Sequence, residues 1–250
     1  MIALVDADSL LYKVGFAIED KVVWNELELL AGEDTEPEIE YYTNIETCKK
    51  TFNQMIESIL YATGCDSAIL VFSGDTNFRH DFPISYKENR KDSRKPEGFA
   101  DILQHAHSTY DTVTKPNIEA DDYVVYLATK FPNDYVLSAI DKDVLYQTVG
   151  THYNYSTGLD VTTTKEEAVR YAYFQTLAGD VTDGYKGCPQ IGEVKAEKLL
   201  DGLETKEEMW QVVVAAYESK GLTEDDALWT MRLANMHQYD GSQINLWNAL

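Results

Sequence analysis

The 250-residue chain contains few cysteines: Cys48, Cys65 and Cys188. Three widely separated thiols cannot form a disulfide framework or a four-ligand zinc site. The five histidines also lack the short spacings of metal-binding histidines. No charged segment followed by an apolar segment begins the chain, so no targeting leader is expected. These absences predict a protein of a reducing compartment, by default the cytoplasm.

Long apolar runs are missing as well, and no stretch approaches the roughly 20 apolar residues of a membrane span. Proline is scarce at six residues, glycine numbers 14, and no low-complexity segment occurs. With 44% hydrophobic and 26% charged residues, the composition is that of an ordinary globular protein. The sequence therefore excludes membrane-spanning, collagen-like and disordered classes, and a chain of this length can bury a core without disulfides.

Basic residues are outnumbered: 21 lysines and arginines face 43 acids, for a net charge of −22. Such a charge disfavours a polyanionic partner, because a negative surface repels phosphates. Placement changes this conclusion, since a carboxylate cluster that binds divalent cations becomes locally positive. The run from Glu26 to Glu40 holds seven carboxylates and no base, which we interpret as a solvated surface. The window from Tyr86 to Pro96 is instead net positive, with Lys87, Arg90, Lys91, Arg94 and Lys95.

Three short apolar runs, at residues 2–5, 68–72 and 135–140, indicate strands that are buried on both faces. The helical patterns between them make the sheet parallel, because parallel strands need long crossover connections. The clearest helix covers residues 45–60, where apolar residues recur every three or four positions before a stop at Gly64. Two weaker patterns, over 21–30 and 152–161, are compatible with hairpins.

From about residue 163 the pattern changes to helices. Residues 165–178 follow an amphipathic helical pattern, and residues 193–200 are predicted to form a short helix. A capping box at residues 205–208 precedes a helix over residues 209–219. The last helix is predicted over residues 228–237. No proline- or serine-rich linker separates the two parts, so we expect them to pack together. The predicted architecture is an α/β core of residues 1–162, with a central mostly parallel sheet flanked by helices, and a C-terminal helical annex of residues 163–250.

Acidic residues stand at or just after the end of each predicted strand. In open α/β sheets the ligand site lies beyond the carboxyl ends of the strands, so these carboxylates can converge. Two further groups space carboxylates three residues apart, one on a helix face and one between glycines. The nine candidates are Asp6, Asp75, Glu119, Asp121, Asp122, Asp141, Asp143, Asp180 and Asp183.

Nine anions in one cleft would repel one another, so their convergence implies bound cations. Oxygen ligands favour Mg²⁺ or Mn²⁺ over zinc, which prefers histidine and cysteine. Two such ions about 3.5 to 4 Å apart clamp the attacking and leaving oxygens of a phosphodiester displacement. Each acid taken singly has a simpler explanation, since aspartate after a strand is often a turn or helix cap. The combination of strand-end acids and spaced groups favours phosphodiester hydrolysis.

Seven short motifs follow one another along the first 200 residues in a characteristic order. They are Val5-Asp6, Gly74-Asp75, Tyr86-Lys87-Glu-Asn-Arg90, Glu119-Ala-Asp-Asp122, Asp141-Lys-Asp143, Gly179-Asp-Val-Thr-Asp183-Gly184 and Gly187-Cys-Pro-Gln-Ile-Gly192-Glu-Val-Lys-Ala196. This series resembles the bacteriophage and bacterial 5′-nucleases, the flap endonucleases and 5′-to-3′ exonucleases with a PIN-like core. The tail from Ala227 to Trp247 is similar to that of phage members.

The resemblance implies a role for each motif. Five acids would surround a first metal ion: Asp6, Asp75, Glu119, Asp121 and Asp122. Four would surround a second: Asp141, Asp143, Asp180 and Asp183. Lys87 and Arg90 would approach the scissile phosphate from the base of an arch, beside DNA contacts from Tyr86, Lys91, Arg94 and Lys95. A helix-three-turn-helix with Gly187, Gly192 and Lys195 would grip duplex phosphates, in some members with a bound K⁺.

The resemblance also implies a substrate: DNA with 5′ ends, flaps or RNA–DNA hybrid, cut by a monomer in the cytoplasm of a bacterial host. Only 28 residues separate Arg90 from Glu119, which is short for an arch that a flap could thread. Without the nine carboxylates the net charge is still −13, so duplex binding is expected to be weak or to need a recruiting replication protein. No association with membranes is expected.

Two alternatives remain open. Asp6-Ala-Asp8 after a strand resembles the nucleophile motif of haloacid-dehalogenase-like phosphatases, and residues 179–183 resemble their metal motif. That metal motif should follow a strand, whereas residues 170–178 are predicted to be helical. The other alternative, an inactive acidic mimic of DNA, would bind a partner's basic surface. A mimic needs neither the basic window nor acids at these positions.

Overall fold

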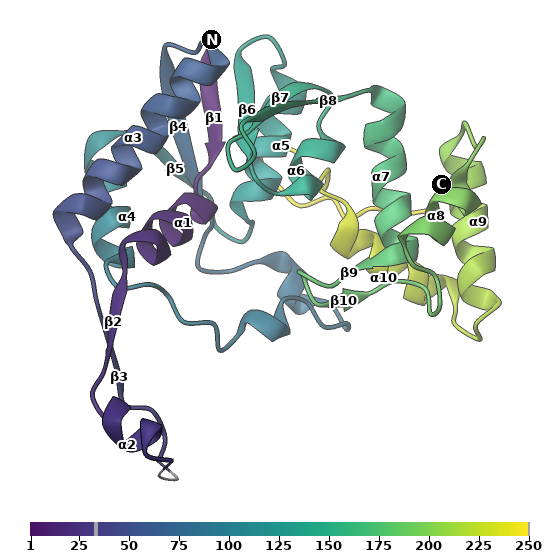
Figure 1. Ribbon diagram of the computed structural model, residues 1–250. Coiled ribbons are helices and arrows are strands. Elements are labelled where there is room, and N and C mark those ends of the chain that lie inside the picture. The colour runs from purple at the N-terminus through teal and green to yellow at the C-terminus, as the bar shows by residue number, and fades with distance from the viewer. Residues whose placement is uncertain (33–34, 250) are drawn as a thin grey trace.

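The computed structural model describes residues 1–32 and 35–249. Its centre is a six-stranded sheet with the order β5-β4-β1-β6-β7-β8 (Figure 1). The strands are β1 (Ile2–Asp6), β4 (Ser67–Phe72), β5 (Asp111–Thr114), β6 (Tyr135–Ala139), β7 (Gly150–Asn154) and β8 (Leu159–Thr163). Neighbouring strands run parallel except β7 and β8. The predicted, mostly parallel α/β sheet is confirmed.

Helices cover both faces of the sheet, because its central strands are apolar and must be buried on both sides. On one face α1 (Asp8–Ile18), α3 (Ile45–Thr63) and α4 (Phe99–Thr109) share a core that contains Leu10, Phe52 and Ile102. On the other face α5 (Ala120–Lys130) and α6 (Lys142–Gln147) contribute Val124 and Leu145. The helix predicted over 45–60 is confirmed as α3.

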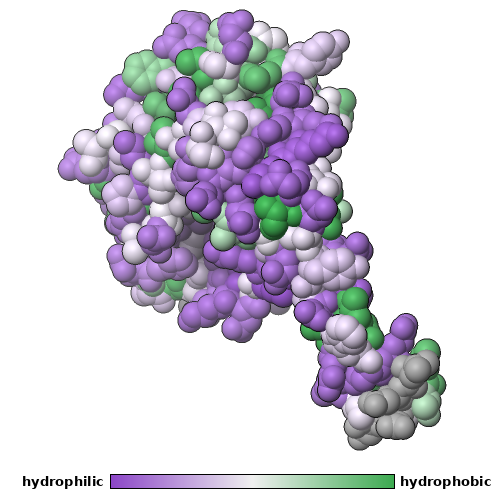
Figure 2. Space-filling model, turned by 90° about the vertical axis from the view of Figure 1, so that its left-hand side faces the viewer, coloured by the Kyte–Doolittle hydropathy of each residue, from purple (hydrophilic) through white to green (hydrophobic). Residues whose placement is uncertain are grey.

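The two hairpin predictions have different outcomes. Residues 152–161 lie in the β7–β8 hairpin, as expected. Residues 21–30 form no hairpin of their own: β2 (Asp20–Val23) pairs with β3 (Ile39–Tyr42), and α2 (Glu26–Leu30) lies between them. The second prediction was wrong because the pairing strand lies outside residues 21–30, at the end of the acidic run. β2, α2 and β3 together form an arm that stands out from the body in Figure 1, and Figure 2 shows the same projection beside a mainly hydrophilic face.

Much of the arm belongs to the acidic run. Residues 35–40 are exposed to solvent, in agreement with a solvated surface. Glu33 and Asp34 lie outside the described residues. Within the part of the chain that the structure describes, no helix combines the length and apolar character that crossing a membrane requires.

After β8 the chain is mainly helical, with α7 (Lys165–Ala178), α8 (Glu193–Leu200), α9 (Lys206–Glu218) and α10 (Glu224–Ala234). Capping boxes at Thr164, Thr205 and Thr223 begin α7, α9 and α10. These helices enclose a separate core that includes Leu177 and Val213. A short ladder joins β9 (Gly179–Asp180) to β10 (Tyr185–Lys186) directly after α7.

Two of the helices differ from their predicted form. The buried residues of α7 gather in its second half instead of one stripe, because α6, α8, α9 and α10 contact it from several sides. The last helix, predicted over 228–237, begins four residues earlier behind the Thr223 cap and ends at Ala234. The segment after α10 returns to the sheet, where Met236 is buried in the core of α5 and α6.

Candidate active site

The carboxyl ends of the adjacent strands β4, β1 and β6 open into a cavity of about 570 Å³. Asp6 is the last residue of β1, and Asp141 is the N-cap of α6 directly after β6. The cavity is lined by six carboxylates, Asp6, Asp8, Asp75, Glu119, Asp121 and Asp141, and by three cations, Lys87, Arg90 and Lys95. The structure thus brings together five of the nine acids selected from the sequence.

Asp8 is a sixth carboxylate that the sequence analysis considered only under the phosphatase alternative. It is the first residue of α1, and its Oδ2 accepts a hydrogen bond of 3.1 Å from the backbone N–H of Ser73. Burial raises the pKa of Asp8. The sequence signal that could have identified Asp8 as a site residue is its position two residues after Asp6, at the start of the helix that follows the strand.

The negative charges of the carboxylates in this cavity repel one another. Burial, followed by repulsion from Asp8 and Asp141, raises the pKa of Asp6 well above its usual range. Burial and the charges of Asp6 and Asp141 have the same effect on the pKa of Asp121. Asp141 therefore acts on both neighbours, and the group as a whole favours an added positive charge.

Lys87 supplies part of that charge. Its Nζ lies 2.6 Å from Oε1 of Glu119 and 3.7 Å from Oδ1 of Asp183. Burial opposes ionisation of both partners. The nearby carboxylates nevertheless raise the pKa of Lys87. The positive charges of Lys87 and Arg79 lower the pKa of Glu119 to about 2. Glu119 and Lys87 are therefore a charged, partly buried pair at the edge of the cavity.

Tyr86 lies beside this pair and does not face a DNA base. It is only 3% exposed, and its hydroxyl donates to Oε2 of Glu119 at 2.6 Å and to Oδ2 of Asp183 at 3.2 Å. The ring is enclosed and the hydroxyl is already paired, so the structure does not present Tyr86 for the contact with DNA that the family resemblance implies. Tyr86 instead fixes the orientation of Glu119.

Three of the four remaining acids form a second group beyond Asp141. Asp143 is buried, and burial followed by the charge of Asp141 raises its pKa to about 7. Asp180 accepts from the backbone N–H groups of Thr182 and Asp183 at 2.6 and 3.1 Å, and pairs with Nζ of Lys142 at 3.3 Å. Asp183 pairs with Arg90 at 3.0 Å. Since Asp141 interacts electrostatically with Asp6, Asp121 and Asp143, it links the two groups.

The donor set fits a hard divalent cation. Its ligand atoms are carboxylate oxygens, and their mutual repulsion is the condition that a bound cation relieves. Among the described residues, no three acids, histidines or cysteines surround one point closely enough to form a ready-made metal site. Lys87, Arg90 and Lys142 instead neutralise Glu119, Asp183 and Asp180.

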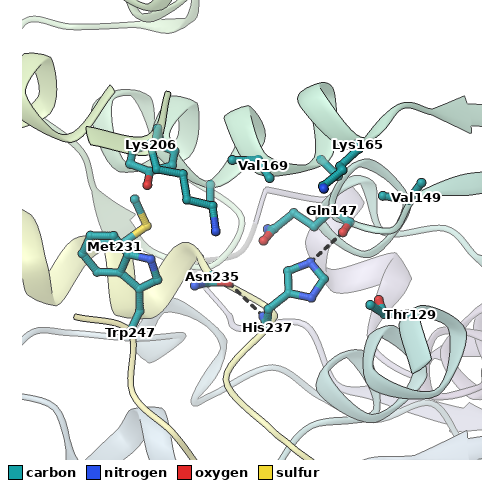
Figure 3. Close-up of a pocket in the computed structure, with 13 residues that line it drawn as sticks. Thr129, Gln147, Val149, Lys165, Val169, Lys206, Met231, Asn235, His237 and Trp247 are labelled. Atoms are coloured by element: carbon teal, nitrogen blue, oxygen red, sulfur yellow. Dashed lines mark hydrogen bonds between the residues drawn. The ribbon is translucent and has the colours of Figure 1, made fainter. Parts of the chain in front are cut away.

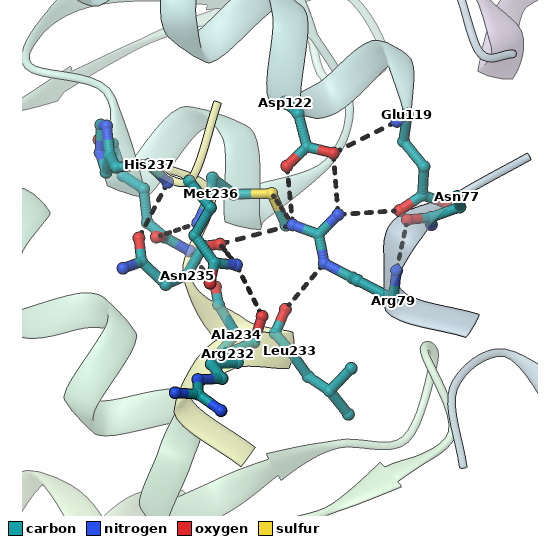
Figure 4. Close-up of polar contacts among 12 residues, drawn as sticks. Asn77, Arg79, Glu119, Asp122, Arg232, Leu233, Ala234, Asn235, Met236 and His237 are labelled. Atoms are coloured by element: carbon teal, nitrogen blue, oxygen red, sulfur yellow. Dashed lines mark hydrogen bonds and ion pairs between the residues drawn. The ribbon is translucent and has the colours of Figure 1, made fainter. Parts of the chain in front are cut away.

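Asp122 is separate from the carboxylates of the cavity. It is fully buried, and both its oxygens accept hydrogen bonds from Arg79, at 2.7 and 2.8 Å (Figure 4). Helix geometry explains the difference, since consecutive residues at the start of α5 point about 100° apart. Asp121 faces the cavity and Asp122 faces Arg79, so the structure does not place Asp122 with the metal ligands expected from the sequence.

Arg79 is a residue that the sequence analysis missed. It is fully buried, lies 3.6 Å from Oε2 of Glu119, and donates from Nε to the carbonyl of Leu233 and from Nη2 to that of Asn235 (Figure 4). The guanidinium thus joins the start of α5 to the end of α10 and the segment after it. Asp122 also accepts from the backbone N–H of Glu119 at 3.2 Å, so this network supports the position of Glu119.

The basic window divides into two parts. Lys87, Arg90 and Lys95 line the cavity, and Lys91 is exposed beside it. Arg94 does not project toward a substrate: it forms an ion pair with Glu19 and lies 3.6 Å above the ring of Tyr41 in β3. Arg94 thus holds the base of the arm and does not line the cavity.

The glycines of the predicted DNA-gripping turn also differ from each other. A Cβ on Gly187 would lie 2.3 Å from the backbone nitrogen of Gly179, so Gly187 allows two backbones to pack and does not face a ligand. Gly192 precedes α8 with a φ of −98° and open space around it. Its backbone is thus free of the left-handed strain that would demand glycine. Lys195 is exposed one turn further along.

A sheet whose strand ends carry clustered carboxylates next to lysine and arginine is suited to chemistry on phosphate esters. The family described as 5′-3′ exonuclease, N-terminal resolvase-like domain, matches residues 1–175. The chain therefore belongs to the 5′-3′ exonuclease family, and it is a 5′ nuclease.

Curated relatives agree with this assignment. The exonuclease of Escherichia phage T7 is 26% identical, with a match that covers 72% of this chain and 73% of that protein. The exodeoxyribonuclease of Enterobacteria phage T3 is 32% identical over 53% of this chain and 46% of that protein. The 5′-3′ exonuclease of Buchnera aphidicola is 28% identical over 58% and 53%. The chain spans about half the length of the last two.

Solved structures share the fold. The flap endonuclease of bacteriophage T5, in a complex with DNA and metal ions, matches with a TM-score of 0.67 at 15% identity, over 94% of this chain and 89% of that one. The catalytic core of Rad2 in complex with DNA substrate matches with a TM-score of 0.54 at 14% identity, over 88% and 66%. The family excludes the phosphatase alternative, and residues 179–183 do follow a helix, α7.

Proposed function

We propose that the protein is a divalent-metal-dependent nuclease that hydrolyses phosphodiester bonds at the 5′ ends of DNA, with flaps and RNA–DNA hybrids as further substrates. The convergence of six carboxylates with Lys87 and Arg90 at the strand ends carries this proposal. The proposed setting is the cytoplasm of a bacterial host. The relatives named as exonucleases and the neighbours crystallised with DNA and metal ions support it.

The proposed ligands are the carboxylates that face the cavity and those of the second group. Asp6, Asp8, Asp75, Glu119 and Asp121 would hold one ion, and Asp143, Asp180 and Asp183 the other, with Asp141 between them. Mg²⁺ or Mn²⁺ bound there would supply electrophilic stabilisation of the phosphate oxygens. Asp122 is left out of this set because Arg79 occupies both its oxygens.

The chain's own cations act on the phosphate. Lys87 and Arg90 lie at the mouth of the cavity, each paired with an acid that the proposal assigns to a metal ion. With metal ions held by those acids, Lys87 and Arg90 would be free to donate hydrogen bonds to the scissile phosphate and to stabilise the charge that develops on it. Tyr86 keeps Glu119 in place during this exchange.

One assay tests the reaction class. The purified protein is incubated with Mg²⁺ and 5′-labelled flap, nicked duplex or RNA–DNA hybrid, and the products are resolved by length. We expect short 5′ products from all three and none when EDTA removes the metal. Cleavage that persists in EDTA, or products that begin at 3′ ends, would refute the proposal.

Lys87→Ala is expected to slow the chemical step by about 10²–10³-fold, because it removes a donor from the developing charge. Lys91→Ala, a matched change in the exposed part of the same window, should leave that step intact and weaken binding with a smaller salt dependence. Single-turnover rates and binding isotherms at several salt concentrations separate the two effects. If Lys87→Ala and Lys91→Ala weaken binding equally and both keep the native single-turnover rate, Lys87 is not a catalytic residue.

We also propose that residues 163–250 form the unit that grips duplex DNA, packed on the nuclease core of residues 1–162. The backbone amides after Gly192 begin α8, and the space beside the Gly192 Cα is open, which suits close approach of a phosphate. Lys195 adds a positive charge on the same exposed turn. A K⁺ ion at this turn and a recruiting replication protein are further expectations of the family resemblance.

Gly192→Val is expected to raise KM for long duplex about tenfold with kcat nearly unchanged, because the side chain would fill the space of the phosphate. Its effect on stability should stay within about 0.5 kcal/mol, since nothing lies near the new side chain. The matched change Gly187→Ala should instead cost about 1–3 kcal/mol by overpacking. Thermal unfolding and steady-state kinetics on duplexes and short single strands check both. Equal losses on a short single strand would contradict the gripping role of Gly192.

A further inference from the structure

A second cavity of about 310 Å³ lies between the nuclease core and the helical annex (Figure 3). Its walls come from the ends of α5 and α6, from α7, α9 and α10, and from the C-terminal segment. It shares no lining residue with the carboxylate cavity of the active site. The mechanism proposed above makes no use of it.

The charge of this cavity is opposite to that of the chain. Its described lining includes no aspartate or glutamate, although the net charge is −22. Lys165 and Lys206, the first residues of α7 and α9, extend their amino groups toward it (Figure 3). Neither lysine forms an ion pair with any residue that the structure describes. Two unneutralised cations facing one cavity favour an anionic ligand.

Polar groups beside the lysines are also unsatisfied. Tyr173 lines the cavity, and its buried hydroxyl has no hydrogen-bond partner among the described residues. His237 donates from Nε2 to the carbonyl of Gln147 at 2.7 Å, which leaves Nδ1 free to meet a ligand.

The end of the cavity beside Lys206 is apolar and aromatic (Figure 3). The Trp247 indole packs on Trp210 with ring centroids 4.8 Å apart. The backbone carbonyl of Trp247 accepts a hydrogen bond from Nε of Arg232 at 2.9 Å. The ring is therefore held in place before any ligand arrives. Met231 lies beside Trp247 at this end, and Val169 lies between the two lysines (Figure 3). An aromatic surface and two ammonium groups in one cavity match a molecule that carries both a flat ring and a phosphate.

We propose that this cavity binds a nucleoside 5′-monophosphate, with its phosphate on Lys165 and Lys206 and its base against Trp247. The proposal rests on the proposed function, because an exonuclease acting on 5′ ends releases this class of molecule. Occupation would connect α7 and α9 to the C-terminal segment. The carbonyl of Asn235 in that segment accepts a hydrogen bond from Arg79, which lies beside Glu119. A bound ligand would therefore limit the movement of the residues that position Glu119.

Calorimetric titration of the full chain in EDTA tests this site without metal-dependent binding or turnover in the active site. The probes are deoxyadenosine monophosphate, deoxyadenosine and inorganic phosphate. We expect the nucleotide to bind at least about tenfold more tightly than either half, because each half meets only one part of the lining. Equal affinity for inorganic phosphate would overturn the nucleotide assignment, as would the absence of heat with nucleotide up to about 10 mM.

Variants locate the binding. Lys165→Ala with Lys206→Ala should weaken nucleotide binding at least about tenfold, through loss of charge-assisted hydrogen bonds. Lys50→Ala with Lys198→Ala removes the same charge from exposed positions elsewhere and should leave the affinity unchanged. Weakening by Lys95→Ala in place of the Lys165 and Lys206 pair would locate binding in the active-site cavity and refute the proposal. A protein that binds the nucleotide but cuts no DNA would refute the proposed function and leave this site standing.

Discussion

Asp141→Asn is expected to lower turnover by at least about 10²-fold at saturating Mg²⁺ while the fold stays intact. Asp141 stands between the two carboxylate groups, and its charge acts on Asp6, Asp121 and Asp143. Removing that charge removes the proposed link between two ions. Asparagine is also a good N-cap, so the hydrogen bond that Asp141 accepts from the N–H of Asp143 at 2.8 Å can be kept.

The same variant should be more stable than the native chain when no metal is present. Three neighbours lose a repelling charge, and catalytic sites commonly sacrifice stability in this way. Asp160→Asn, an exposed aspartate on β8, provides the matched control and should change neither property. Single-turnover rates over a Mg²⁺ titration and melting temperatures in EDTA are the measurements. If Asp141→Asn cleaves at the rate of the native protein at every Mg²⁺ concentration, the assignment of the carboxylates to two linked metal-binding groups is wrong.

The position of the cavity was predictable from the sequence because it depends on topology. Apolar runs that end in acids become parallel strands, and parallel strands bring their ends to one edge. That reasoning correctly placed Asp6, Asp75 and Asp141 together. It needed no knowledge of the packing between helices.

The direction of single side chains was not predictable in the same way. Asp121 and Asp122 are neighbours at the start of one helix and point in different directions, and the sequence does not indicate that Arg79, 43 residues before Asp122, pairs with only one of them. The family resemblance assigned Tyr86 and Arg94 to DNA, yet in the structure they pair with Glu119 and Glu19, which lie in distant segments of the chain. Pairings of this kind depend on tertiary contacts that no local pattern records.

Arg79 gives the second large effect: Arg79→Met is expected to reduce the free energy of unfolding by about 3–5 kcal/mol, because Asp122 would be left buried without a partner. Both residues are fully buried, so water cannot replace the lost hydrogen bonds. The carbonyls of Leu233 and Asn235 would lose a donor as well. Urea unfolding should show a lower midpoint with an unchanged slope. Lys91→Met, at an exposed position, is the control and should stay within about 0.5 kcal/mol.

The double change Arg79→Met with Asp122→Leu distinguishes a buried charge from lost packing. If the cost of the single change comes from the unpaired carboxylate, an apolar residue at position 122 should restore most of the stability, since buried ion pairs are often replaceable by apolar residues. Activity should recover less than stability, because Asp122 also accepts from the backbone N–H of Glu119 and Arg79 lies against its carboxylate. A double variant as unstable as Arg79→Met would show that packing of the arginine, and not its charge, joins the annex to the active site.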